Sequence, residues 1–379
     1  MTARLKAWGA NLALLCFAIA LTAIAFEVAL HFFLPQKLYR FPRGLFRNDS
    51  ELVFTLAPGF QGTLHNPEYI TEIHINAMGL RGELPGTKTP GVTRILGLGD
   101  SFVSAFNMAE ADTFLRVTEK WLRANLAGRE LEVVNAGTPN YGTWHELRLF
   151  QRIAPLLHPD MALLCVYVGN DLENNLNPRE ALVRDGFLLE RRRQEGLLPY
   201  PVRSWLQRNS MAYVFLWNAW NHLRPWFGRN ESDSLKSDKD LIARKPPPGV
   251  DKGYRVTEEL LREFQTECEA LKIPMVVVLI PTEFQVYPDR FWSSLRKQGL
   301  DPSSFDLELP QRRWSEIARA AEIPTLDLLP VFRQHASGPY LYMSIDGHLT
   351  QEGNRLAGEA IAAEISAVLE RSPRQESSR

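Results

Sequence analysis

The stretch Arg94-Ile-Leu-Gly-Leu-Gly-Asp-Ser-Phe102 joins a short aliphatic run to a Gly-Asp-Ser turn. The run has the length and composition of a buried strand in a parallel sheet. The turn places Ser101 at the carboxyl end of that strand, where open α/β sheets bind their ligands. A serine hydroxyl there can act as a nucleophile if a histidine lies beside it. Gly-Asp-Ser alone is a common turn, so the assignment depends on the rest of the chain.

Four more aliphatic runs follow the first strand and alternate with helical patterns. The five predicted strands are Arg94 to Leu98, Leu131 to Asn135, Ala162 to Val168, Pro274 to Ile280 and Ile323 to Leu328. This alternation is typical of a parallel sheet covered by helices on both faces. We therefore predict an α/β fold, a three-layer α/β/α sandwich with a five-stranded parallel sheet.

The sequence indicates the two ends of one helix in this domain and the apolar face of another. Asp112 is expected to cap the helix after the first strand, and Gly128 to close it. A final helix carries its apolar residues on one face, namely Leu356, Ala360, Ile361, Ile365 and Leu369.

The third predicted strand ends in Val168-Gly-Asn-Asp171, again at the carboxyl edge of the sheet. The amide of Asn170 would lie near Ser101 and could stabilise an oxyanion, a contribution of about 3 to 4 kcal/mol for one such donor. The alternative is an Asn-Asp turn whose side chains bind their own backbone.

Near the C-terminus, Ser344-Ile-Asp-Gly-His-Leu-Thr350 places a carboxylate two residues before an imidazole. Asp346 would accept a hydrogen bond from one ring nitrogen of His348 and fix its tautomer, while the other nitrogen takes the Ser101 proton. A metal site at this pair would need further ligands nearby, so we predict none.

These three segments, in this order, resemble the SGNH (or GDSL) hydrolase family over about residues 93 to 370. The resemblance implies a flavodoxin-like α/β/α fold and esterase or acyl-transfer chemistry without a cofactor. It also implies an oxyanion hole built from the backbone N–H groups of Ser101 and Asn140 and the side chain of Asn170.

The chain departs from the family pattern in two places. The second block, Asn135-Ala-Gly-Thr-Pro-Asn-Tyr-Gly142, has Asn140 where the family usually has a glycine donor. The last block is Asp-x-His, whereas many members have Asp-x-x-His, and this spacing resembles the alginate O-acetyltransferase branch. Two further segments, Ile75 to Arg81 and Ile280 to Gln285, look like features of membrane-anchored members.

The N-terminal segment from Ala7 to Phe26 carries no charged residue. About 20 helical residues at about 1.5 Å each span the roughly 30 Å of a bilayer core. A cleavable signal peptide is the alternative, because Ala23-Ile24-Ala25 offers an A-x-A site. We favour an uncleaved anchor because apolar residues resume after Glu27. This predicts a single-pass inner-membrane protein whose catalytic domain lies on the exported (periplasmic or extracellular) side.

The remaining segments are assigned by composition and pattern. The predicted organisation is 1–35 as anchor or signal, 36–92 as a lead-in with short strands, 93–372 as the hydrolase domain and 373–379 as a disordered tail. An insertion at about 178–253 interrupts the α/β alternation. Within it, an aromatic stretch from Trp205 to Phe227 predicts two helices, and Arg229 to Gly249 predicts a flexible loop. The two helices could cap the active site, contact a membrane surface or simply pack on the domain.

Composition limits the partners. The chain has 379 residues and a formal charge of −1, without a basic stripe, so nucleic acid is not an expected partner. Cys16, Cys165 and Cys268 show neither metal-site spacing nor a disulfide framework. The sequence names no protein partner.

Three functions remain open at this point. We predict a serine esterase acting on an O-acyl, in particular O-acetyl, ester of an envelope or extracellular carbohydrate. An O-acyltransferase to a polysaccharide would use the same residues. A non-catalytic carbohydrate-binding or assembly component of an envelope complex is the rival from another class.

Overall fold

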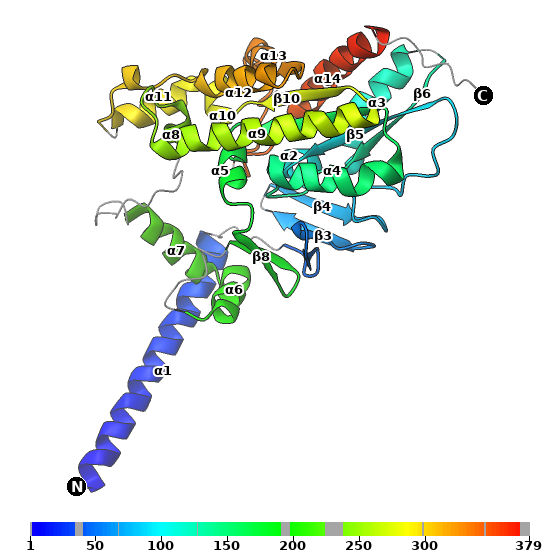
Figure 1. Cartoon of the computed structure of the whole chain (residues 1–379). Helices are drawn as coiled ribbons and strands as arrows, with labels where there is room; N and C mark the ends of the chain where they lie inside the picture. Colours follow the sequence, from blue (N-terminus) through cyan, green and yellow to red (C-terminus); the bar gives the residue numbers. More distant parts are fainter. Residues whose placement is uncertain are drawn as a thin grey trace. The chain divides into compact units, whose positions relative to one another are not determined.

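The computed structural model describes residues 2–34, 41–66, 68–126, 128–190, 198–223, 238–297, 299–344 and 346–371 (Figure 1). Two compact units are present. The smaller comprises Met1–Phe41, His65–Pro67 and Arg192–Ser232, and the larger contains the remaining segments.

A single five-stranded sheet forms the centre of the larger unit, and all its strand pairs are parallel. Its strands are β5 (Val92–Gly99), β6 (Glu130–Asn135), β7 (Met161–Tyr167), β10 (Met275–Ile280) and β11 (Thr325–Asp327). All five predicted strands are therefore confirmed to within a few residues.

The strand order is β6-β5-β7-β10-β11, which is the flavodoxin-like order. The chain winds from β5 outward to β6 and then returns to place β7 on the other side of β5. The order thus reverses at β5 and β7, and this switch point is where such sheets form their ligand crevice. The sequence places Ser101 and Asn170 directly after these two strands.

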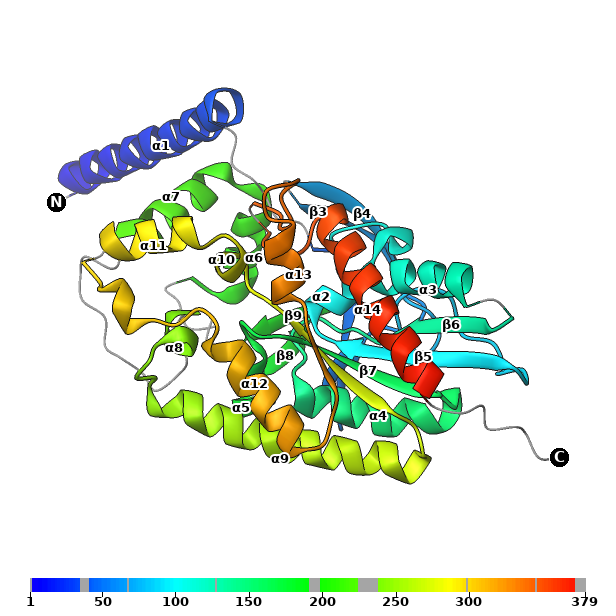
Figure 2. The same cartoon turned by 90° about the horizontal axis from the view of Figure 1, so that it is seen from above.

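Helices cover both faces of the sheet, which confirms the three-layer prediction (Figure 2). On one face lie α3 (Phe114–Asn125) and α14 (Gln351–Arg371), and on the other α4 (Thr143–Leu157), α9 (Pro248–Leu271) and α12 (Leu309–Ala320). The α14 residues predicted to face inward are in the core: Leu356, Ile361, Ile365 and Leu369 are buried, and Ala360 packs beside them.

The predicted N-cap of α3 is wrong in two respects. Its position is off by one residue, and a different side chain accepts from the first helical N–H. Asp112 lies in a single 3-10 turn, Glu110–Asp112, and Thr113 precedes the helix without a side-chain cap. The first helical N–H, that of Phe114, instead donates to Oδ1 of Asn354 on α14 at 2.9 Å. A residue distant in sequence supplies the cap, so the local pattern could not reveal it. At the other end the helix closes on Leu126, two residues before Gly128.

The lead-in contains the expected short strands. β1 (Phe46–Asp49) pairs with β2 (Val53–Leu56), and β3 (Gln61–Asn66) pairs with β4 (Tyr69–His74). Short helices complete the larger unit: α2 (Ser101–Ser104), α5 (Asp171–Leu176), α8 (Asp238–Ile242), α10 (Glu283–Val286), α11 (Pro288–Lys297) and α13 (Leu329–Gln334). The boundaries at 35, 92 and 372 stay predictions, and the tail 373–379 lies outside the described residues.

The insertion holds more structure than predicted. A hairpin of β8 (Ala181–Arg184) and β9 (Phe187–Glu190) turns at Asp185-Gly186, both with positive φ. It was not predicted, although an Asp-Gly pair between apolar runs is a strong hairpin signal. The predicted loop from Arg229 to Gly249 is wrong in its second half, because α8 forms there and buries Leu241 and Ile242. Its first half, to residue 237, lies outside the described residues.

The smaller unit contains the helices expected at the N-terminus and in the aromatic stretch. α1 runs over Thr2–Phe33, α6 over Tyr200–Asn209 and α7 over Met211–Leu223. Residues Asn11–Phe33 of α1 are long and apolar enough to cross a membrane, a property that a signal sequence shares. The rest of the predicted aromatic stretch, from residue 224 to Phe227, lies outside the described residues.

Candidate active site

Ser101 is the first residue of α2 and directly follows the turn that ends β5. The turn needs a glycine at position 99, where φ is +155°. A Cβ on Gly99 would lie 2.3 Å from Cγ2 of Val103 and 2.6 Å from the carbonyl oxygen of Cys165. The close approach of β7 therefore fixes the glycine, and with it the direction in which Ser101 leaves the sheet.

Ser101, His348 and Asp346 lie in one hydrogen-bonded chain. Oγ of Ser101 is 2.8 Å from Nε2 of His348, and Nδ1 of His348 is 2.8 Å from Oδ2 of Asp346. The histidine lies 247 residues from the serine in sequence, and the fold brings them together at the carboxyl edge of the sheet. This is the arrangement in which a carboxylate orients an imidazole that can accept a hydroxyl proton.

The imidazole packs against an aromatic pair. The ring centroid of Phe102 lies 4.8 Å from that of His348, and the Phe102 ring stacks on Tyr167 at 4.1 Å. Phe102 is buried, so the residue after the serine forms a wall beside the imidazole. Such packing restricts the rotation of the imidazole.

Two residues of the lead-in hold the loop that carries Asp346. The hydroxyl of Tyr69 donates to Oδ2 of Asp346 at 3.1 Å. The Glu68 carboxylate accepts from the backbone N–H of Asp346 at 2.7 Å and from Oγ of Ser344 at 2.8 Å. Neither residue was predicted as part of the site, because they precede the domain in sequence and match no motif.

Asp100 connects the serine turn to Asn170. Its fully buried carboxylate accepts from the Phe102 N–H at 2.8 Å and from Nδ2 of Asn170 at 3.1 Å. Burial raises the pKa of Asp100, and these two hydrogen bonds oppose that shift. One of the two Nδ2 hydrogens of Asn170 thus fixes its amide, and the second is available to another acceptor.

The loop of residues 136–142, which follows β6, contacts both the segment after β5 and the segment after β7. A Cβ on Gly137 would come within 2.3 Å of the backbone nitrogen of Ser104, and Nδ2 of Asn174 donates to the carbonyl of Tyr141 at 2.9 Å. Asn140 in this loop has φ +68°, in the left-handed region that glycine adopts freely and asparagine tolerates best among other residues. The substitution of the family's glycine by Asn140 therefore keeps a backbone shape that glycine would take.

Arg81 binds the C-terminal end of α2. Its buried guanidinium donates to the carbonyl oxygens of Ser104, Ala105 and Met108, the last two at 2.6 and 2.7 Å. Ser104 ends the short helix that begins with Ser101, and Ala105 and Met108 follow it, so Arg81 caps the helix at its C-terminal end. Desolvation lowers the pKa of Arg81 to about 10, which leaves it charged at neutral pH.

Two further carboxyl groups are buried near Asp100. Neither Glu146 on α4 nor Asp171 at the start of α5 finds a hydrogen-bond partner for its carboxyl oxygens among the described residues. Burial raises the pKa of each well above its ordinary value, and the charge of Asp100 raises it further.

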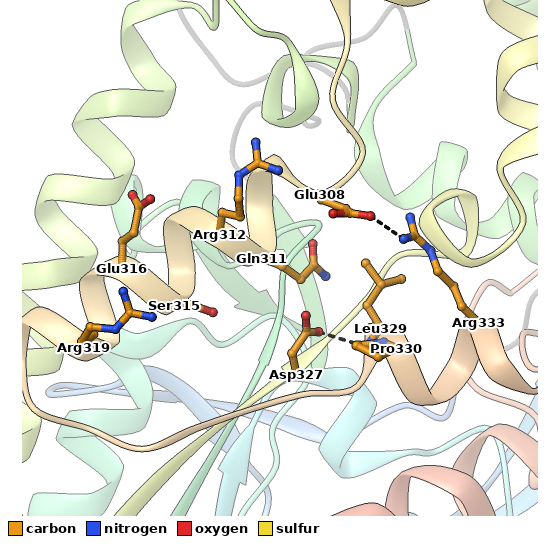
Figure 3. A pocket seen from close by; sticks show the side chains of 10 residues that line it. All are labelled: Glu308, Gln311, Arg312, Ser315, Glu316, Arg319, Asp327, Leu329, Pro330 and Arg333. Atoms are coloured by element: carbon orange, nitrogen blue, oxygen red, sulfur yellow. Dashed lines mark hydrogen bonds and ion pairs between the residues drawn. The ribbon is translucent and has the colours of Figure 1, made fainter.

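No group of three or more His, Cys, Asp or Glu side chains in the described ranges is arranged to hold a metal ion. A hollow of about 420 Å³ is formed by α12, β11 and α13 (Figure 3). Figure 3 shows Glu308 paired with Arg333 at its rim and Asp327 bonded to the backbone of Leu329. Its lining does not include Ser101, Asp346 or His348.

Comparison with curated protein sequences gives no match. Among solved structures, the psychrotrophic esterase EstA from Pseudoalteromonas sp. is 11% identical with a TM-score of 0.39, over 73% of this chain and 99% of that one. The lipase/acylhydrolase from Enterococcus faecalis is 15% identical with a TM-score of 0.38, over 73% and 96%. A variant of the acetyl xylan esterase Axe2 from Geobacillus stearothermophilus is 13% identical with a TM-score of 0.38, over 72% and 94%.

A protein-family comparison matches the C-terminal part of the chain. Residues 243–378 fit the family described as the SGNH hydrolase-like domain of the acetyltransferase AlgX. This range contains β10, β11, α14 and the Asp346-Gly-His348 segment, and the five-stranded parallel sheet joins it to β5 and β7. Residues 243–378 of this chain are therefore similar to the SGNH hydrolase-like domain of the acetyltransferase AlgX.

Proposed function

We propose that this protein is a membrane-anchored serine esterase or O-acyltransferase that acts on O-acyl, in particular O-acetyl, carbohydrate. Ser101 is the nucleophile, His348 the general base and acid, and Asp346 the group that orients the imidazole. The observation that carries the proposal is the chain of two 2.8 Å contacts from Oγ of Ser101 through His348 to Asp346.

The first chemical step forms an acyl-enzyme. Oγ of Ser101 attacks the ester carbonyl carbon while its proton passes to Nε2 of His348, and a tetrahedral intermediate forms. When this intermediate collapses, the ester C–O bond breaks, and the departing sugar oxygen takes the proton from Nε2. The acyl group remains on Ser101, and the imidazole is neutral again.

The second step releases the acyl group. Water, or a hydroxyl group of a second sugar, gives its proton to His348 and attacks the acyl carbon. The bond to Oγ of Ser101 then breaks, and the serine recovers the proton from the imidazole. Hydrolysis and transfer differ only in the acceptor of this step.

The oxyanion of both steps would be bound by the N–H groups of Ser101 and Asn140 and by the side chain of Asn170. Support for Asn170 comes from its fixed amide, since Asp100 binds one Nδ2 hydrogen and leaves the other for the substrate. A preorganised donor of this kind needs no reorientation as the negative charge develops.

The similarity of the C-terminal part of the chain supports a substrate class. An acetyltransferase domain model matches residues 243–378, so O-acetyl transfer to or from a polysaccharide is the chemistry that this similarity favours. We assign an O-acetylated carbohydrate as substrate or product.

The proposed location is the inner membrane, with α1 as a single uncleaved anchor and the catalytic domain on the exported side. The apolar span Asn11–Phe33 supports this, because its 23 residues suffice to cross a bilayer. An acyl carbohydrate of the cell envelope would be available on that side.

The test is acetyl release by the full-length chain in detergent, with p-nitrophenyl acetate as donor and Ser101→Ala as control. We expect p-nitrophenol release that depends on Ser101, and addition of a free oligosaccharide should yield acetylated sugar if transfer prevails. Equal release by the Ser101→Ala variant would refute the mechanism. A folded wild-type protein that releases nothing but binds the oligosaccharide would instead favour a carbohydrate-binding or assembly role.

A further inference from the structure

The carboxylate of Glu27 joins α1 to the start of α7. Its oxygens accept from Oγ of Ser210 at 2.7 Å, from the N–H of Met211 at 2.5 Å and from the N–H of Ala212 at 3.1 Å. These N–H groups belong to the first turn of α7 and have no partner within the helix. An anionic side chain at this end is also favoured by the helix dipole. Glu27 therefore caps a helix that begins 184 residues later in the chain.

Apolar contacts accompany this cap. The ring of Phe26 meets that of Phe215 edge to face at 5.8 Å, and Leu30, one turn further along α1, is buried. Thus one stripe of α1 near its carboxyl end packs on α7, whereas residues 11 to 25 of α1 are exposed. The attachment is confined to the last turns of the apolar span.

The contact with Glu27 fixes the position of α7 along the apolar span of α1, and therefore its depth if α1 crosses a membrane. Glu27 lies six residues before Phe33, the end of the span, which corresponds to about 9 Å along a helix axis. The bilayer core is about 30 Å thick, so a spanning α1 places Glu27 in the outer part of the membrane, close to the headgroups. The carboxylate is paired with donors there, as an ionisable group at that depth requires.

The two helices beside this point expose large apolar side chains. Trp205 of α6 is 61% exposed and Leu216 of α7 is 58% exposed, and Val202 and Trp217 are also exposed. Tyr213 stacks on Trp217 at 6.2 Å. Tryptophan and tyrosine concentrate at membrane–water interfaces, because their rings are amphipathic.

Their lengths exclude a second crossing. α6 has 10 residues and α7 has 13, and a helix of 13 residues reaches only about 20 Å. The α7 sequence Met-Ala-Tyr-Val-Phe-Leu-Trp-Asn-Ala-Trp-Asn-His-Leu contains no Asp, Glu, Lys or Arg. α6 combines Arg203 and Arg208 with the exposed Val202 and Trp205, and basic residues beside apolar and aromatic ones are typical of helices that lie in the plane of the interface.

We propose that α6 and α7 form a membrane-interface element, which lies in the headgroup region beside an uncleaved α1 and has lipid as its partner. The proposal rests on the anchored location given above and not on the acyl-transfer chemistry. Figure 1 shows α7 and α6 near the carboxyl end of α1, within the smaller unit. The element would hold the chain at the surface by a second contact besides the single span.

The experiment uses the full-length chain in vesicles of phosphatidylethanolamine and phosphatidylglycerol. Leu216→Cys is labelled with an environment-sensitive fluorophore in a Cys16→Ser background, since Cys165 and Cys268 are buried. We expect blue-shifted emission that is quenched more strongly by lipids carrying a nitroxide near the headgroup than by lipids carrying it at the chain end. The same label at Glu259→Cys, on an exposed position of α9, should show neither effect.

Three results would overturn the proposal. The first is water-like emission at position 216. The second is blue-shifted emission without quenching by either lipid, because protein would then cover this face, as in an active-site lid. The third is an intact mass showing that the chain has lost residues up to Ala25.

The Glu27 cap is tested in the same vesicles. Glu27→Ala should lower the headgroup quenching at position 216, whereas Val28→Ala, an exposed side chain of the same helix, should leave it unchanged. Equal quenching in both variants would contradict the role of Glu27. Acetyl release is measured on the same samples. Because the membrane contact does not depend on the acyl-transfer chemistry, a loss of quenching and a loss of acetyl release are distinguishable.

Discussion

The hydroxyl of Tyr69 donates a hydrogen bond to Oδ2 of Asp346 at 3.1 Å, and the same carboxylate oxygen lies 2.8 Å from Nδ1 of His348. Tyr69 begins β4, 277 residues before Asp346. The lead-in hairpin is thus part of what holds the proposed orienting carboxylate. A fragment that begins at the first strand of the sheet would lose this contact.

Removal of the Tyr69 hydroxyl should slow catalysis without a loss of substrate binding. A hydrogen bond to a charged group contributes about 1.5 to 3 kcal/mol, so Tyr69→Phe is expected to lower kcat by about tenfold or more, with KM unchanged. Steady-state kinetics with p-nitrophenyl acetate measure this split. Tyr254→Phe is the matched control, since the Tyr254 hydroxyl is buried on α9 without a partner in the described part of the chain. A kcat equal to wild type in Tyr69→Phe would contradict the positioning role.

The side chain of Asn170 is predicted to act in the transition state. Loss of one oxyanion donor costs about 10² to 10³ in kcat, so Asn170→Ala should show a fall of that size with little change in KM. Asn125→Ala removes an exposed amide from α3 and serves as control. If kcat of Asn170→Ala stays within about twofold of wild type, the amide serves only to hold Asp100.

The buried carboxyl of Glu146 should make the fold less stable as pH rises. Burial raises the pKa of Glu146 well above its ordinary value, whereas in the unfolded chain it is about 4.3. Above pH 4.3 or so the unfolded state releases this proton and the folded state keeps it, so the free energy of unfolding falls with pH. Glu146→Gln removes the ionisation and should flatten this decline between about pH 4 and pH 8.

Urea unfolding across this pH range measures the effect. Glu263→Gln, on the exposed surface of α9 where it pairs with Arg148, is the control and should keep the wild-type decline. The same slope in Glu146→Gln as in wild type would show that Glu146 does not remain neutral in the folded protein.

The sheet was predictable because its signals are local. β5, β7 and β10 are runs of mostly buried apolar residues. Gly99-Asp100-Ser101 and Asn170 follow the first two of these runs, and the Asp346-Gly-His348 segment precedes the last helix. Their contacts could be inferred from the rule that parallel strands end at one edge. The Asp185-Gly186 hairpin carried a comparable local signal.

Other parts of the site could not be read from the sequence. Tyr69 and Arg81 contact the site only after chain segments far apart in sequence have packed, and no spacing or motif marks those partners. Glu146 resembles any helical glutamate until α4 is seen to bury it against the sheet. The cap that Asn354 provides for α3 likewise forms only when α14 packs beside α3. Such residues depend on tertiary structure, which local patterns do not encode.

The nucleophilic role of Ser101 is tested most directly by covalent labelling. The full-length chain is treated with a fluorophosphonate, and the labelled peptide is identified by mass spectrometry in wild type, Ser101→Ala and Ser104→Ala, the last removing a nearby buried hydroxyl. We predict one adduct, on Ser101, in wild type and Ser104→Ala and none in Ser101→Ala. An adduct on another residue that persists in folded Ser101→Ala, or no adduct in active wild-type protein, would contradict the proposed mechanism.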